Sequence, residues 1–304
     1  MINRFIAFVC DRIIFPLWDN IVYRTLFTSP RIANTEETLS YICLNKCSVS
    51  RFGDGELEMC WRRTNLGFQR FDAHMSKRLR EILCRPAEEH NHIVCIPYTY
   101  LDVSHLSAYP AAFWRKIKRR HSMTILPWLP RIQYYDTQCT RLYMDYALKE
   151  KCENMFQMWK KVWRDKNVVI IEGESSRLGV GNDLFDSAKT LRRILVPAKD
   201  AYSVYDKILR TAKAYCSCDD LILLAIGPTA SILAYDLACL GFWAIDVGHI
   251  DIEYMWCQMG AHAKVAIPGR LMNEVTVQAE QSVEDDSYHE SILCVVKTED
   301  KDKV

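Results

Sequence analysis

The chain has 304 residues, 49% hydrophobic and 25% charged, and a formal net charge of +1. These values are ordinary for a soluble globular protein, and the length allows one large domain or two modest ones. The near-neutral charge gives no support for nucleic acid as a partner. Thirteen cysteines are scattered without a CxxC pair. We interpret them as reduced, mostly buried thiols of a reducing compartment.

Residues 1–20 are apolar and aromatic, but charged residues interrupt them and Pro16 breaks them. They carry no visible secretory signal and fall short of the roughly 20 apolar residues that a spanning helix needs. Two interpretations remain: a helix packed on the domain, or an interfacial helix on a membrane surface. We therefore expect a cytoplasmic protein, either free of the membrane or peripheral at its inner face.

The first half of the chain mixes predicted helices and short strands. Strands are expected at 48–50, 92–97 and 123–126. Helices are expected over 35–47, 73–84, 104–120 and 138–163.

A glycine-rich turn after the first of these strands carries two carboxylates. Asp54 and Glu56 lie one residue apart, and Gly53 and Gly55 allow a ligand to approach closely. Neighbouring carboxylates repel unless a cation neutralises them, and their oxygens suit Mg²⁺ or Mn²⁺ held together with substrate phosphates. Arg51 would add a planar fork for a phosphate oxygen. The alternative is that Asp54 and Gly55 form only a hairpin turn.

The second half predicts an α/β fold with a mainly parallel, Rossmann-like sheet flanked by helices. Apolar strands are expected at 168–171, 191–196, 221–226 and 243–247, with helices over 201–215 and 228–240. Ligands of such sheets bind beyond the carboxyl ends of the strands, so the residues after each strand are the candidates for a site.

A long polar loop follows the strand at 168–171. Arg177, Gly179 and Gly181 give it a weak signal for anion binding, and Asn182 or Asp183 is a candidate N-cap for a following helix. The loop is neither a Walker A motif nor a complete GxGxxG fingerprint. That absence argues against a dinucleotide-dependent oxidoreductase.

Two further strand ends carry candidate ligand groups. Gly227, Pro228 and Thr229 begin a helix, and they either direct amides and a hydroxyl at a ligand or form a βα turn and no more. The last strand-to-helix transition carries a histidine and two acids: His249, Asp251 and Glu253. The acids are either favourable first-turn residues or, with the histidine, groups for acid/base work or ligand contact.

Four motifs in this order resemble the bacterial glycosyltransferases of the GT-D fold, a family first described as a domain of unknown function. They are Arg51-Phe52-Gly53-Asp54-Gly55-Glu56, the loop 172–185, Gly227-Pro228-Thr229-Ala230 and the segment 246–254. The likeness covers residues 35–275. It divides the chain into an N-terminal helical segment (1–34), a glycosyltransferase domain (35–275) and an acidic C-terminal tail (276–304), which we expect to be mobile or solvated.

The resemblance implies a GT-D fold and metal-dependent transfer of a hexose, typically glucose from UDP-glucose, to a glycan acceptor on a protein or lipid carrier. Such a transfer would serve surface polysaccharide or glycoprotein synthesis. The family's DxE motif maps onto Asp54 and Glu56, which would hold Mn²⁺ or Mg²⁺ against the donor. The other motif residues would bind the nucleotide sugar: Arg51, Gly53, Gly55, Arg177, Gly179, Gly181, Asn182, Gly227, Pro228 and Thr229.

On the acceptor side, we expect His249, Asp251 or Glu253 to position or deprotonate the hydroxyl, with inversion and retention both open. One departure stands in the last motif, where Met255 replaces an expected glutamate. The main alternative function is a non-catalytic nucleotide-sugar-binding subunit of a glycan assembly complex. Retention of Asp54 and Glu56 argues against this alternative, and Met255 leaves room for it.

Overall fold

The computed structural model describes residues 30–85, 89–270, 272 and 286–298. Within them, nine strands form one sheet in the order β1-β4-β3-β2-β8-β7-β5-β6-β9, and the strand pairs are parallel. The strands are β1 (Arg31–Ile32), β2 (Ser48–Arg51), β3 (His92–Ile96), β4 (Gln133–Asp136), β5 (Asn167–Gly173), β6 (Thr190–Val196), β7 (Leu221–Ala225), β8 (Trp243–Asp246) and β9 (Ile292–Val295).

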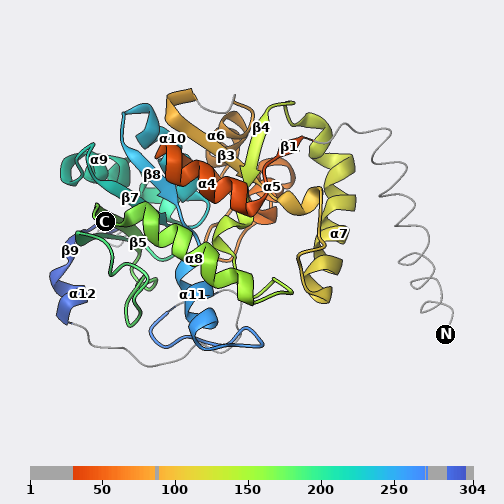
Figure 1. Ribbon diagram of the computed structural model, residues 1–304. Coiled ribbons are helices and arrows are strands. Elements are labelled where there is room, and N and C mark those ends of the chain that lie inside the picture. Colours follow the sequence, from red (N-terminus) through yellow and green to blue (C-terminus); the bar gives the residue numbers. More distant parts are fainter. Residues whose placement is uncertain (1–29, 86–88, 271, 273–285, 299–304) are drawn as a thin grey trace.

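Helices lie on both faces of the sheet, which gives three layers (Figure 1). The α-helices are α4 (Thr35–Asn45), α5 (Asp54–Arg62), α6 (Ala73–Leu83), α7 (Ala108–Thr124), α8 (Glu150–Trp163), α9 (Tyr205–Tyr215), α10 (Thr229–Cys239), α11 (Ile250–Gln258) and α12 (Asp286–Glu290). Short 3₁₀ turns are η3 (Glu89–Asn91), η4 (Tyr98–Tyr100), η5 (Leu126–Trp128), η6 (Thr137–Thr140) and η7 (Ala201–Val204). No helix among the described residues is long and apolar enough to cross a bilayer.

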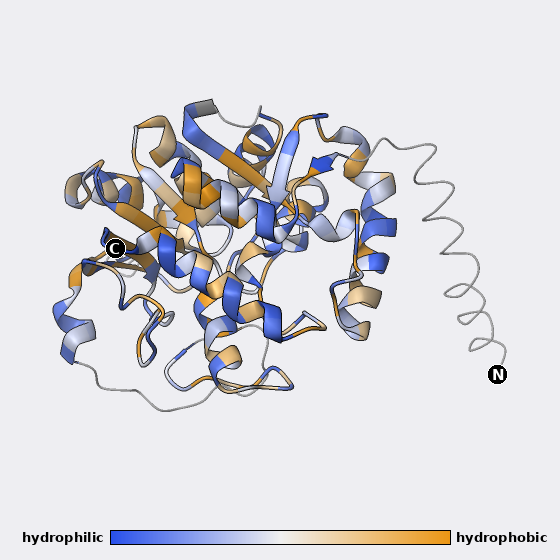
Figure 2. Cartoon of the chain, in the orientation of Figure 1, coloured by the Kyte–Doolittle hydropathy of each residue, from blue (hydrophilic) through white to orange (hydrophobic). Residues whose placement is uncertain are grey.

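The apolar strand residues alternate between two core layers. In β5, Val168 and Ile170 pack in the core formed with α4, α8 and α11, whereas Val169 and Ile171 pack in the core formed with α9 and α10. Because side chains of a strand alternate between its faces, a strand covered on both faces is apolar throughout. Figure 2 shows these strands as hydrophobic arrows inside a more hydrophilic shell.

At the middle of the sheet, the chain leaves the neighbouring strands β2 and β8 toward opposite faces. β2 pairs with β8, with Val49 opposite Ile245. After β2 the chain continues into α5 and α6, which pack in one core, and after β8 it continues into α11, which packs in the other. A crevice therefore opens between the carboxyl ends of β2 and β8, the position where open α/β sheets bind ligands.

Three expected elements differ from the structure. The strand expected at 123–126 is wrong, because those residues end α7 and begin η5; the strand of this region is β4. The helix expected over 138–163 exists only as α8, since η6 and irregular turns occupy its first part. No helix follows Asp183 in the loop between β5 and β6.

The C-terminal residues that the structure describes correct the expectation of a solvated tail. β9 pairs in parallel with β6 at the edge of the sheet, and Tyr288 of α12 is buried. The pairing satisfies backbone groups that an open edge would leave exposed. The segments 1–29 and 273–285, and with them the predicted N-terminal helix, lie outside the described residues.

Candidate active site

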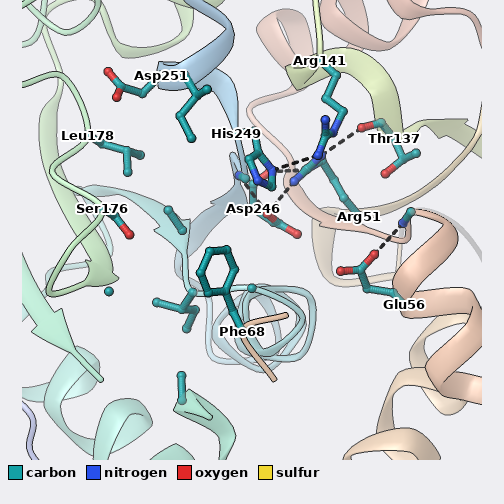
Figure 3. Close-up of a pocket in the computed structure, with 18 of the residues that line it drawn as sticks. Arg51, Glu56, Phe68, Thr137, Arg141, Ser176, Leu178, Asp246, His249 and Asp251 are labelled. Carbon is teal, nitrogen blue, oxygen red and sulfur yellow. Dashed lines mark hydrogen bonds and ion pairs between the residues drawn. The ribbon is translucent and has the colours of Figure 1, made fainter. Parts of the chain in front are cut away.

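A pocket of about 200 Å³ occupies the crevice at the carboxyl ends of the central strands. Its charged lining residues come from the ends of β2 and β8 and from the segment after β4. Figure 3 shows Glu56 and Arg141 on one side and Asp251 on the other, with His249 between them. The pocket thus brings together strand ends that are far apart in the sequence.

Asp54 and Glu56 face this pocket from the first turn of α5. The Gly53 N–H donates to Glu56 Oε2 at 2.9 Å, so this oxygen caps the helix, while no described residue makes a hydrogen bond with Oε1. The Asp54 carboxylate makes no hydrogen bond or ion pair with any described residue. Burial raises the pKa of Glu56 to about 7, and the nearby Asp246 and Asp54 carboxylates add to the rise. Two neighbouring acidic groups therefore lie at this end of the pocket, where a bound cation would favour the charged form of Glu56.

Arg51, at the same end of the pocket, is held by hydrogen bonds to neighbouring residues of the protein. Its guanidinium donates to the Asp246 carbonyl (2.9 Å), to Asp246 Oδ1 (3.1 Å) and to the Thr137 carbonyl (3.0 Å). Burial alone would lower the pKa of Arg51, but the Asp246 carboxylate raises it. Gly248 leaves room for this arrangement, because a Cβ there would lie 1.8 Å from Arg51 Nη2. Arg51 thus joins three strand ends and lines the pocket.

His249 lies at the N-cap of α11 and lines the pocket. Arg141 Nη2 approaches its Nδ1 at 3.4 Å (Figure 3). Arginine has donors only, so this contact fits a ring whose Nδ1 accepts.

Asp251 lines the pocket, yet both of its oxygens are occupied by the protein. Oδ1 accepts from the Gly179 N–H (2.8 Å) and from Asn182 Nδ2 (2.7 Å), and Oδ2 accepts from Arg270 Nε (2.5 Å). Arg270 also donates to the Val180 carbonyl at 2.6 Å. Asp251 and Arg270 are buried, so this ion pair fastens the loop after β5 to α11.

Glu253 is fully buried and does not line the pocket. Its Oε2 accepts from the backbone N–H groups of Tyr143 (2.9 Å) and Met144 (2.8 Å). Its Oε1 has no hydrogen-bond partner in the described structure, and burial raises the pKa of the carboxyl group. Glu253 therefore supports the segment that carries Arg141.

The remaining candidates of the loop after β5 lie outside the pocket lining. Arg177 stacks over the ring of Tyr288 at 5.2 Å. Gly179 and Gly181 have positive φ, and a Cβ at Gly179 would lie 2.4 Å from Phe185. Asn182 also accepts from the Leu184 N–H at 3.0 Å, an Asx-type turn in place of the expected helix cap. Ser175, Ser176 and Leu178 are the loop residues that line the pocket.

At the start of α10 only Gly227 of the three candidates lines the pocket. Thr229 is buried, and its hydroxyl donates to Gln69 Oε1 at 3.4 Å. Gly55, the other glycine of the first motif, packs under Leu66, whereas Gly53 lines the pocket. The glycine-rich motifs therefore serve both the pocket and the packing around it.

The other half of the pocket is apolar. Its lining comes from the ends of β6 and β7 and from the turn after α5: Phe68, Pro197, Ala198, Ala201, Ala225 and Ile226. Phe68 is held over this region by three hydrogen bonds of Asp200, which we call the latch. The Asp200 N–H donates to the Phe68 carbonyl (2.7 Å), and its carboxylate accepts from the N–H and the Nε of Arg70 (both 2.7 Å).

The sequence interpretation missed the residues that follow β4. Thr137, Gln138 and Arg141 line the pocket, and the buried Gln138 side-chain amide has no hydrogen-bond partner in the described structure. Trp114 of α7 lines it too. Recognition of the β4 strand would have directed attention to the residues after it. The aromatic and polar sequence Gln-Tyr-Tyr-Asp hid that strand.

The two carboxylates of α5 fit a divalent cation that shares its ligands with a substrate. Among the described residues, no group of three or more His, Cys, Asp or Glu side chains could hold an ion alone. Mg²⁺ commonly binds through one or two carboxylates together with waters and substrate phosphates. The unpartnered Asp54 carboxylate and Glu56 Oε1 provide such a partial set of hard oxygen ligands.

The chain is similar to glycosyltransferases in sequence. The family profile described as "Glycosyltransferase GT-D fold" matches residues 49–275. "Probable glycosyl transferase Gly" of Streptococcus gordonii is 34% identical over 260 residues, which cover 86% of this chain and 38% of that protein. "Glycosyltransferase GlyD" of Streptococcus pneumoniae serotype 4 is 32% identical over 265 residues, which cover 86% of this chain and 32% of that protein. The chain thus spans about a third of the length of these curated relatives.

Solved structures of the same domain superimpose on the chain. One, described as domain of unknown function 1792 with "a distinct glycosyltransferase fold", has a TM-score of 0.82 and 33% identity, covering 88% of this chain and 96% of that chain. Another, "A New Glycosyltransferase (DUF1792) from Streptococcus sanguinis", has a TM-score of 0.80 and 32% identity, covering 88% and 99%. The chain belongs to the family of glycosyltransferases with the GT-D fold.

Proposed function

We propose that the protein is a metal-dependent hexosyltransferase that moves a sugar, glucose by the family resemblance, from a UDP-sugar to a glycan acceptor. The observation that carries this proposal is the Asp54 and Glu56 pair: two carboxylates at a helix start, turned into the pocket at the switch point of the sheet and without an ion pair to any described residue. Uncompensated carboxylates of this kind suit Mn²⁺ or Mg²⁺.

The two halves of the pocket match the two halves of a nucleotide sugar. The apolar half, closed by Phe68, suits the flat face of a nucleobase. The charged half suits the diphosphate and the sugar, with Asp54 and Glu56 on the metal side. The unsatisfied Gln138 amide is a candidate for sugar hydroxyls, because a buried amide gains most from a partner that completes its hydrogen bonds.

Each residue of the charged half has a distinct part in the proposed transfer. Asp54 and Glu56 would hold a divalent ion, which would offset the charge that develops on the departing UDP. Arg51 keeps the ends of β2 and β8 in register, so the carboxylates face the donor. His249 lines the charged half and orients an oxygen of donor or acceptor, while Arg141 contacts its ring.

The acceptor is a glycan on a protein or lipid carrier, and surface polysaccharide or glycoprotein synthesis is the process that we propose for it. Met255, the departure from the expected motif, packs against the core and does not line the pocket. Its presence therefore removes no group from the pocket, which favours a catalytic protein over a binding subunit.

Donor hydrolysis and transfer across a panel of UDP- and GDP-sugars, with and without Mn²⁺, test the proposal. We expect turnover of a UDP-hexose that depends on the metal. His249→Gln should lower transfer by about 10²-fold, the smaller end of the usual effect of a catalytic acid or base, and leave UDP binding intact. His262→Gln, at an exposed histidine outside the pocket, is the matched control. Binding of UDP and Mn²⁺ without turnover of any sugar would favour the non-catalytic alternative.

A further inference from the structure

The outer face of α7 carries exposed aromatic and basic side chains in one stripe. Tyr109, Phe113, Lys116, Arg120 and Met123 follow one another at steps of four and three residues, which aligns them along an α-helix. All five are exposed, with exposed fractions of 85% for Tyr109, 40% for Phe113 and 68% for Met123. Three large apolar side chains thus share this stripe with two cations.

The opposite face of α7 fixes the orientation of the helix. Its inward residues are buried, and Trp114 among them lines the active-site pocket. Figure 1 shows α7 at the edge of the molecule. The exposed stripe therefore lies on the outside of a wall of the pocket.

The turn after α7 extends the exposed apolar surface. Trp128, the last residue of η5, is 71% exposed, and the neighbouring Pro127 is also exposed. Several large, exposed apolar side chains that lie close together indicate an interaction surface.

Positive charge concentrates in the same segment. No acidic residue occurs between Asp102 and Asp136, whereas the whole chain has a net charge of only +1. The segment contains six basic residues: Arg115, Lys116, Lys118, Arg119, Arg120 and Arg131. One of them, Arg120, pairs with Glu58 of α5, and Arg115, Lys116 and Arg131 are exposed.

We propose that α7 and η5 dock the protein on a membrane surface that carries anionic lipid headgroups. Clusters of four to eight Lys and Arg residues on an amphipathic helix bind such surfaces, at about 1 kcal/mol per cation. Tyrosine and tryptophan reside at the headgroup level, and the long stems of lysine and arginine lie along the apolar layer with their charges outward. Phe113 and Met123 supply the apolar face that enters this boundary.

Other partners fit the stripe less well. Protein interfaces are depleted of lysine and of unpaired charge at their centres. Single-stranded polyanions are bound in a basic groove with stacking aromatic residues, whereas this stripe lies on the outside of a helix and includes Met123. An anionic bilayer uses both the cations and the aliphatic and aromatic groups.

Docking through α7 would bring the pocket close to the membrane, because Trp114 on the inner face of the same helix lines it. An acceptor on a lipid carrier would then meet the pocket without leaving the bilayer surface. The docking itself does not depend on the proposed transfer and is measured separately from it.

Sedimentation of the full chain with vesicles tests the proposal. We expect binding to vesicles of equal parts phosphatidylcholine and phosphatidylglycerol, weakened by salt, and little binding to phosphatidylcholine alone. Each cation removed should weaken binding about fivefold, so Arg115→Gln with Lys116→Gln should weaken it about 25-fold. Phe113→Ser with Trp128→Ser should also weaken it.

Matched controls separate this surface from general charge and hydrophobicity. Lys151→Gln with Lys213→Gln removes two exposed lysines elsewhere, and Leu44→Ser with Met259→Ser removes two exposed apolar side chains elsewhere. Both controls should bind vesicles as the unaltered chain does. All four double variants should keep their thermal unfolding midpoint, which shows that lost binding is not lost folding.

Three results would overturn the proposal. The first is equal binding to both kinds of vesicle, or to neither. The second is unchanged vesicle binding by the α7 variants, with loss only when residues 1–29 are removed, which would assign the contact to the N-terminal segment. The third is binding to single-stranded DNA in the absence of vesicle binding, which would assign the stripe to a soluble polyanion.

Discussion

Two carboxylate pairs with the same spacing, Asp54 with Glu56 and Asp251 with Glu253, begin helices after the neighbouring strands β2 and β8. The first pair is partly exposed to the pocket, and no described residue makes a hydrogen bond with the Asp54 carboxylate or with Oε1 of Glu56. In the second pair, Asp251 is held by Arg270 and two amide donors, and Glu253 accepts from two backbone amides.

The difference shows that spacing does not separate a ligand site from a structural anchor. Both pairs occupy the first turn of a helix, where acidic side chains are favourable because the backbone N–H groups there have no partners within the helix. Long-range neighbours decide their use. Arg270, Tyr143 and Met144 reach the second pair, whereas no cation from the described chain reaches Asp54. We therefore propose that the first pair serves ligand binding, and we expect the second to serve stability.

The largest effect should follow from a change in the first pair. Asp54→Asn keeps the shape of the side chain and removes the charge that we assign to metal binding. We expect transfer to fall by about 10³-fold or more, since a bound ion contributes several kcal/mol to catalysis. The free energy of unfolding should change by no more than about 0.5 kcal/mol. Steady-state kinetics and urea unfolding measure the two quantities. Asp219→Asn, at an exposed site, is the control, and a fully active Asp54→Asn variant with unchanged metal dependence would contradict the comparison.

Asp251→Asn should show the reverse pattern. The substitution leaves the buried Arg270 without its anionic partner, and loss of one member of a buried ion pair costs about 3–5 kcal/mol. Urea unfolding should report this loss in the free energy of unfolding. If the variant is instead as stable as the unaltered protein and binds UDP and Mn²⁺ but does not transfer, Asp251 acts in the reaction and the two pairs are functionally alike.

Glu253→Gln should have a smaller effect of the same kind. The amide oxygen still accepts from Tyr143 and Met144, but the bonds lose their charge, so we expect a loss of about 1–3 kcal/mol in the free energy of unfolding. The affinity for UDP should not change, because Glu253 lies outside the pocket. Calorimetric titration with UDP and Mn²⁺ checks this part, and a large loss of UDP affinity in a stable variant would place Glu253 in the donor site.

The smallest effect concerns the pH dependence of the free energy of unfolding, which must be known before the two pairs are compared at one pH. Burial lowers the pKa of His92, beside β2, to about 3, below its ordinary value of about 6.5. Between these values the unfolded chain binds a proton that the folded chain does not. Stability should therefore decline on acidification, by about 1.4 kcal/mol per pH unit from this residue.

His92→Gln removes that proton site while keeping a donor for Ser50 Oγ, which accepts from His92 Nε2 at 2.7 Å. Urea unfolding between pH 7 and about 5 should give a shallower pH dependence for the variant. Equal slopes for the two proteins would show that His92 does not set the acid sensitivity of the scaffold.

The sequence predicted the half of the fold whose strands contain continuous apolar runs. β5, β7 and β8 pack in the cores on both faces of the sheet, and β6 ends in the buried run Ile194–Val196, so these runs are visible without the structure. β4 was missed because Tyr134 and Tyr135 stand between polar residues, and β9 because it lies in an acidic segment. β4 and β9 are each stabilised by pairing with a neighbouring strand, and a local sequence pattern does not reveal that pairing.

The location of the site was predictable from the sequence, but only some of the residues that form it were. The rule of strand ends identified Asp54, Glu56, Gly227 and His249, which line the pocket. It also pointed to Arg177, whose partner Tyr288 lies far along the chain in α12. The partners of a charged side chain therefore decide whether it is free for a ligand, and those partners come from elements distant in sequence.

The latch at Asp200 has a consequence for timing. Its three hydrogen bonds hold the turn that carries Phe68 over the apolar half of the pocket, so opening of this turn would help to release a nucleotide bound there as proposed. In many enzymes such an opening, and not the chemical step, limits turnover. The strength of one surface contact between Arg70 and Asp200 would then set the residence time of the spent nucleotide, and with it the pace at which successive sugars are delivered.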